Sequence, residues 1–171
     1  ASTYPSRPVR FIVPFPPGGS GDIAARTIGQ KLAESWGQPV IVENRPGGNT
    51  LVGAEHVARA MPDGHTLLVA VDATLTMNAA LYAKLPYRPS DFLPVSLLVE
   101  QPLLLSSGPL RAGASDLAGF LEDVRAKPGK TNIGVGAMVT RVIAERLKRV
   151  ASLDFEIVQF QGGPLTFRAI L

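Results

Sequence analysis

The sequence of 171 residues contains no cysteine. Disulfide bonds, thiolate metal sites and a cysteine nucleophile are therefore excluded, although this absence does not separate cytoplasm from periplasm. No apolar run approaches the ~18 residues that cross a bilayer. Residues 1–5 (ASTYP) have neither the charged region nor the apolar region of a signal peptide. We expect no direct membrane insertion and no signal peptide in this chain.

Charged residues are scarce, at 18% of the chain, and the formal net charge is only +3. Most basic residues are scattered along the sequence, which argues against nucleic-acid binding. One local cluster joins Arg141, Arg146, Lys148 and Arg149 with Glu145. Because Glu145 lies four residues before Arg149, a helical spacing, the cluster predicts a solvated helix face.

Hydrophobic residues make up 46% of the sequence, enough for a core in one large or two small domains. Short apolar runs alternate with amphipathic stretches, a pattern typical of an α/β fold with mainly parallel sheets. The clearest helix, 22–36, has one apolar stripe and is followed by Gly37, a stop signal. Its stripe consists of Ala25, Ile28, Leu32 and Trp36. The other elements predicted in the first half are strands at 9–13, 40–43 and 67–71, a helix from a Thr50 cap to about 60, and a short helix ending near 81.

The second half repeats this strand and helix rhythm. The stretch 86–94 carries three prolines and predicts an irregular crossing, so we expect one α/β domain at 1–100 and a second at 101–171. The predicted elements are a helix from a Ser115 cap to Pro128, a strand at 131–135, a helix at 139–150 with the stripe Val139, Ile143, Leu147 and Val150, a strand at 156–160, and a turn at 161–164 that opens one more helix.

Three glycine-rich turns follow predicted strands, at 16–22, 47–48 and 162–163. Open parallel sheets bind ligands at the carboxyl ends of their strands. Glycine allows close backbone approach, and the amides of a helix start favour anions. In the first turn, Asp22 could cap the helix or accept a ligand proton. For a single loop of this kind, a tight turn with a capping residue is the favoured interpretation, and the repetition of the glycine pair reduces its weight relative to anion binding.

Enzymatic motifs fit these loops poorly. A phosphate-binding P-loop needs lysine followed by serine or threonine, and no lysine lies in any of the three. Ser20 lacks the glycine two residues later that a hydrolase elbow requires. Residues 134–139 (GVGAMV) resemble a dinucleotide fingerprint only weakly, because its third glycine is replaced by valine. His56 and His65 have no metal-ligand spacing. We therefore expect no enzyme, no metal and no cofactor.

Four ordered motifs resemble the Bug/TctC family, the extracytoplasmic solute receptors of tripartite tricarboxylate transporters. They span nearly the whole chain, and together they are far more specific than any single glycine pair. The motifs are residues 4–19 (YPSRPVRFIVPFPPGG) with Asp22 and Arg26, residues 42–49 (VENRPGGN), residues 62–68 (PDGHTLL) and residues 85–92 (LPYRPSDF).

The resemblance implies two α/β domains joined by crossing strands and one small carboxylate held between them by loop amides, water and a few side chains. It also implies a periplasmic location and a transporter or sensor as partner, with no cofactor. Arg45 and Asn49 are less certain contacts, because their loop could serve only to turn the chain. The ligand-binding residues that the resemblance implies are Phe15, Pro17, Gly18, Gly19, Asp22, Thr74, Asn78, Gly134 and Gly136.

Two departures from the family pattern stand out. Many members have glycine, serine and then histidine at the second-domain helix start, where this chain has Gly136, Ala137, Thr140 and Arg141. Arg141 could meet a second carboxylate. The chain also stops at 171, whereas members run to roughly three hundred residues, so we expect an incomplete second domain that self-associates or binds ligand poorly. A nucleotide- or phosphate-binding enzyme domain and a non-binding fragment remain the alternatives.

Overall fold

The computed structural model describes residues 4–108 and 116–171. The chain divides into two compact units, residues 1–100 and 101–171. Both units are of the α/β type, and every strand pair in them is parallel. The predicted α/β class with parallel sheets is confirmed. None of the helices in the described part is both long and apolar enough to cross a membrane.

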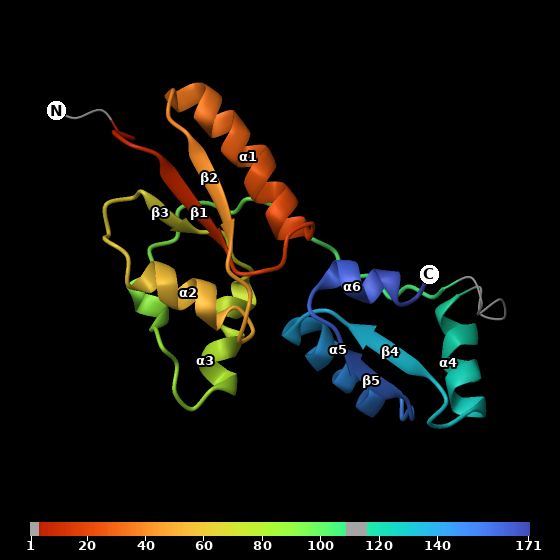
Figure 1. Cartoon of the computed structure of the whole chain (residues 1–171). Helices are drawn as coiled ribbons and strands as arrows, with labels where there is room; N and C mark the ends of the chain where they lie inside the picture. The colour runs from red at the N-terminus through yellow and green to blue at the C-terminus, as the bar shows by residue number, and fades with distance from the viewer. Residues whose placement is uncertain (1–3, 109–115) are drawn as a thin grey trace. The chain divides into compact units, whose positions relative to one another are not determined.

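The first unit is built on a three-stranded parallel sheet in the order β2-β1-β3 (Figure 1). Its strands are β1 (Val9–Val13), β2 (Val40–Asn44) and β3 (Thr66–Leu68). The central strand, β1, is buried almost throughout because it has a neighbour on each side and helices on both faces. Its end, at Val13, is in register with Asn44 at the end of β2.

Helix α1 (Ser20–Trp36) packs on one face of this sheet, against Val9, Phe11 and Val13. All four residues of the predicted stripe take part in that contact, and the helix ends at Gly37 as expected. Because side chains alternate along a strand, Arg10 and Ile12 point to the other face. Helix α2 (Leu51–Ala58) lies there. The unit continues with η1 (Asp72–Thr74), α3 (Met77–Leu81) and η2 (Pro89–Asp91).

Two local predictions in the first unit are wrong. Strand β3 ends at Leu68 instead of continuing to 71. The last bond of its ladder runs from the Val69 amide to the Ile12 carbonyl, at 2.9 Å, and Pro14, which follows β1, has no N–H to extend the ladder. Thr50 occupies the N-cap position of α2, but its side chain makes no capping hydrogen bond and instead accepts one from Asn78.

In its described residues, 101–108 and 116–171, the second unit contains a two-stranded parallel sheet and three helices (Figure 1). Its elements are α4 (Leu117–Ala126), β4 (Asn132–Val135), α5 (Met138–Val150), β5 (Glu156–Gln159) and α6 (Gly163–Arg168). The predicted Ser115 cap lies outside the described residues. Asp116 caps α4, accepting a hydrogen bond from the Gly119 amide at 2.8 Å.

The core of the second unit uses only part of the stripe predicted for α5: Leu147 packs against the core, but Ile143 and Val150 do not. Ile143 and Val150 are 47% and 74% exposed, whereas Ala144, Leu147 and Ala151 pack against Val124, Val135 and Phe155. The small Ala144 is suited to a close approach of helix and sheet, and Val142, Ile143 and Val150 are left exposed. Apolar side chains of α6, including Phe167, are also exposed, and self-association through them stays a prediction.

Candidate functional site

The loop from 14 to 19 joins the central strand β1 to helix α1 at the carboxyl end of the strand. Pro17 and Gly18 are exposed, while Phe15 and Gly19 are partly buried. Gly18 has a φ of +82°, a conformation that side chains with a Cβ rarely adopt. Its amide donates to Asp22 Oδ2 at 2.9 Å. The loop is thus tied back onto the first turn of α1.

Asp22 is the centre of this arrangement and is only 4% exposed. Arg26 donates to both of its carboxylate oxygens, at 3.1 Å and 2.9 Å. Asn44 donates to Oδ1 at 2.9 Å and also to the Phe15 carbonyl at 3.1 Å. The hydrogen bond from Arg26 is the main cause that lowers the pKa of Asp22 to about 2, with the Gly18 amide and Asn44 adding to it and burial opposing it.

Asp22 is therefore ionised at neutral pH, and its oxygens already accept several hydrogen bonds. This arrangement favours a role in holding the loop over the acceptance of a ligand proton. Asn44 is a residue that sequence reasoning missed, although it belongs to the VENRPGGN motif. Its position at the end of β2, beside the end of β1, was the available signal, because neighbouring parallel strands deliver their ends to the same sheet edge.

A second cluster joins the loop after β2 to helix α3. Asn78, 1% exposed, donates to the Asn49 carbonyl at 3.0 Å and to Thr50 Oγ1 at 3.2 Å, and Asn49 donates back to Asn78 Oδ1 at 2.7 Å. Tyr87 lies 3.3 Å from the Asn78 amide nitrogen and donates to the Thr74 carbonyl at 2.5 Å. The predicted residues Thr74 and Asn78 are thus brought together, with Asn49 beside them.

The hydroxyl oxygen of Thr74 is buried, and no hydrogen-bond partner for it occurs in residues 4–108 and 116–171. Tyr87 was not singled out from the sequence, and its position in the motif at 85–92 was the available signal. Asn78 and Tyr87 are both almost completely buried, so they set the conformation of the loop around Asn49. Neither has an accessible surface with which to recognise a ligand.

Arg45, considered from the sequence as a less certain ligand contact, pairs with a carboxylate of the protein. Its guanidinium pairs with Glu43, which also accepts a hydrogen bond from Arg10. Bonding to Arg10, with a further contribution from Arg45, lowers the pKa of Glu43 in spite of the opposing effect of burial. Arg45 therefore serves a charge cluster on the α2 side of the sheet.

In the second unit, Gly134 lies within β4 and Gly136 follows it. A Cβ at Gly136 would come within 2.7 Å of the Gly162 carbonyl carbon and 2.8 Å of Thr166 Oγ1. A Cβ at Gly134 would meet Phe160 at 3.1 Å. The close backbone approach requires a glycine at 136 for the packing of α6 and its loop, whereas Gly134 allows a tight contact with Phe160; the ligand contact of both glycines stays a prediction. Arg141 is exposed on α5, and its predicted contact with a second carboxylate also stays a prediction.

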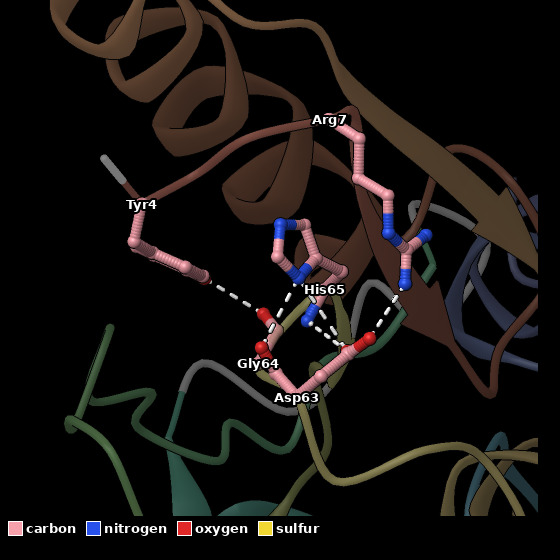
Figure 2. Close-up of polar contacts among 5 residues, drawn as sticks. All are labelled: Tyr4, Arg7, Asp63, Gly64 and His65. Atoms are coloured by element: carbon pink, nitrogen blue, oxygen red, sulfur yellow. Dashed lines mark hydrogen bonds and ion pairs between the residues drawn. The ribbon is translucent and has the colours of Figure 1, made fainter. Parts of the chain in front are cut away.

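His65 lies in a structural turn. The His65 amide donates to Asp63 Oδ1 at 3.0 Å, Arg7 pairs with Asp63 at 2.7 Å, and Tyr4 donates to the Gly64 carbonyl at 2.7 Å (Figure 2). This turn holds the N-terminal segment against the first unit. Among the residues that the structure describes, no group of three or more His, Cys, Asp or Glu side chains is placed to hold a metal ion.

Residues 24–171 match the family model TctC, described as "Tripartite tricarboxylate transporter family receptor". The chain is 38% identical over 169 residues to Protein BugT of Bordetella pertussis, covering 96% of this chain and 52% of that protein. It is 38% identical over 163 residues to a UPF0065 protein from the tcbD-tcbE intergenic region of Pseudomonas sp., covering 94% of this chain and 48% of the relative. The chain thus spans about half the length of these relatives.

Solved structures give the same result. MatC from Rhodopseudomonas palustris, described with bound malate, superposes with a TM-score of 0.84 at 36% identity, covering 98% of this chain and 57% of that one. A second R. palustris protein, described with adipate, gives a TM-score of 0.91 at 28% identity, with 98% and 56% covered. The sequence resemblance is confirmed: this chain belongs to the TctC family of tripartite tricarboxylate transporter receptors.

Proposed function

We propose that this chain is part of a periplasmic solute receptor that binds a small carboxylate and delivers it to a membrane transporter or a sensor. The observation that carries the proposal is the loop of the exposed Pro17 and Gly18 and the partly buried Gly19, tied to the start of α1 by the buried Asp22. The same fold occurs in relatives described with malate and adipate. The family is one of transport receptors, and we infer that the chain has no catalytic activity.

The electrostatics of the loop support a carboxylate ligand. The first amides of a helix have no partner within the helix and carry about half a positive charge between them. The negative charge of Asp22 is compensated by Arg26, so that a ligand carboxylate near the loop does not meet an uncompensated like charge. Phe15 and Pro17 add apolar surface beside these amides, which suits the carbon chain of an organic acid.

Thr74 and Asn78 contribute to the proposed site by shaping the neighbouring loop. Asn78 fixes the Asn49 backbone, and the buried Thr74 hydroxyl lies in the same cluster. Gly134 and Gly136 of the second unit belong to the proposal on the family resemblance alone.

A thermal-shift panel with malate, adipate, citrate and ATP tests the proposal. Trp36 is the single tryptophan and packs in the core of the first unit, so its fluorescence follows the unfolding of that unit. A carboxylate at a hundred times its dissociation constant should add about 2.7 kcal/mol of stability. Stabilisation by ATP but by none of the acids would support the alternative of a nucleotide-binding domain and overturn the proposal.

A further inference from the structure

A cavity of about 380 Å³ lies on the α2 side of the first sheet, away from the α1 face. Arg10 of β1 and Thr66 of β3 form part of its wall, and these two residues are in register as strand partners. The second half of α2 and the residues just after it complete the wall with Glu55, His56 and Arg59. Donor groups from three elements therefore line one cavity.

The charges around this cavity do not cancel. Glu43 is shared by two guanidinium groups, those of Arg10 and Arg45, and Glu55 pairs with Arg59. The cavity wall itself holds two arginines, Arg10 and Arg59, and one carboxylate, Glu55, so its charge is positive even with His56 neutral; the neighbouring pair of Glu43 and Arg45 adds no net charge. An excess of positive charge inside a concave surface is the arrangement that concentrates small anions.

The excess of positive charge affects the pKa of the His56 imidazole. Burial is the largest cause that lowers its pKa, and Arg45 and Arg10 lower it further, whereas Glu43 acts in the opposite direction. Among the neighbouring charged groups, two arginines lower the pKa of His56 and one carboxylate raises it. An anion bound beside His56 would reverse this balance and favour the protonated imidazole.

We propose that this cavity is a second anion site, which binds a small divalent oxyanion such as phosphate through Arg10, Arg59, Thr66 and His56. The guanidinium groups supply planar pairs of N–H donors that match the oxygens of such an anion. Thr66 supplies a neutral hydroxyl donor, and His56 binds the anion most strongly when both ring nitrogens carry protons.

This site is separate from the proposed carboxylate loop. The start of α2 carries Thr50 and the cluster around Asn78, whereas the polar residues that this helix contributes to the cavity come from its second half and the residue after it, with only the apolar Val52 from its first turn. The Gly18 loop packs with α1 on the opposite face of the sheet. Oxyanion binding in the cavity therefore does not rest on the proposed receptor function, and either can fail without the other.

The test is an NMR titration of the two histidine side chains of the whole chain between pH 5 and pH 8. Spectra are recorded in sodium phosphate and in sodium chloride of matched ionic strength. We expect phosphate to raise the pKa of His56 by on the order of 1 unit, in a saturable manner, and to leave the buried His65 signal in place. His65 thus serves as an internal reference.

Arg59→Gln removes one donor and should weaken phosphate binding about tenfold. The matched control is Arg88→Gln, which also breaks an exposed ion pair in the first unit, with Asp91, but does not line the cavity. Backbone amide shifts establish that both variants are folded. The proposal is overturned if the His56 pKa does not respond, responds equally to chloride, or still responds fully in Arg59→Gln.

Discussion

Replacing Asp22 with asparagine should destabilise the first unit by between about 1 and 2 kcal/mol at pH 7. The pKa of Asp22 falls from its ordinary value of 3.8 to about 2, mainly because Arg26 donates to the carboxylate. At 1.36 kcal/mol for each pKa unit, this change corresponds to about 2 kcal/mol. Arg26 is 53% exposed, so solvent screening reduces the pair's contribution and sets the lower end of the range.

The destabilisation should depend on pH in one direction. Because the folded-state pKa of Asp22 lies below its unfolded value, the stabilisation is complete above about pH 4 and is lost as the pH falls towards 2. Wild type and variant should therefore become more alike on acidification. The neutral side chain is also a weaker acceptor for the Gly18 amide, so the loop should exchange its amide hydrogens faster in the variant.

Urea unfolding followed by Trp36 fluorescence at several pH values between 7 and 3 measures both effects. The matched control is Glu34→Gln, which breaks an exposed pair with Lys31 on the same helix and should cost less than about 1 kcal/mol. The reasoning about Asp22 would be refuted if its variant were no less stable than the control. A difference between wild type and Asp22→Asn that stayed constant down to pH 3 would refute the pKa argument.

Two further substitutions test the packing of the loops. Asn78→Ala should destabilise the first unit by about 2 to 3 kcal/mol, because it leaves the buried groups around Asn49 without partners. Urea unfolding measures this loss of stability. A loss no greater than that of the exposed control variant Thr76→Ala would contradict the prediction. Gly136→Ala should destabilise the second unit by about 1 to 3 kcal/mol, because its Cβ would overlap the loop before α6. Hydrogen exchange of the β4 amides measures that loss, and Gly163→Ala, whose Cβ meets nothing within 4 Å, should leave the exchange unchanged.

The sequence was sufficient to predict α1 because its apolar residues define a single helix face and Gly37 ends the helix. It was insufficient for α5, where two faces compete. Large apolar residues such as Ile143 suggest one face, but the small Ala144 on another face allows the close approach that the core uses. Residue size along a single helix does not reveal which face the sheet requires.

In the candidate site, too, some residues could be predicted from the sequence and others could not. The glycine loop and Asp22 were recognisable because the motif is continuous in the sequence. Asn44 and Tyr87 were not, because their roles depend on partners that the fold brings together: Asn44 bonds to Asp22, and Tyr87 bonds to Thr74. The shortening of β3 likewise depends on Pro14, which precedes it by more than fifty residues.

The most direct test of the account is whether a carboxylate binds at the loop that Asp22 holds through the Gly18 amide. Two-dimensional NMR of the whole chain, titrated with malate and with adipate, follows the amide signals of Gly18 and Gly19. The account predicts saturable shifts at these two amides with at least one of the acids, and weaker binding in Asp22→Asn. Saturable binding that left both amides unmoved and shifted signals elsewhere would contradict it, as would the absence of binding by either acid.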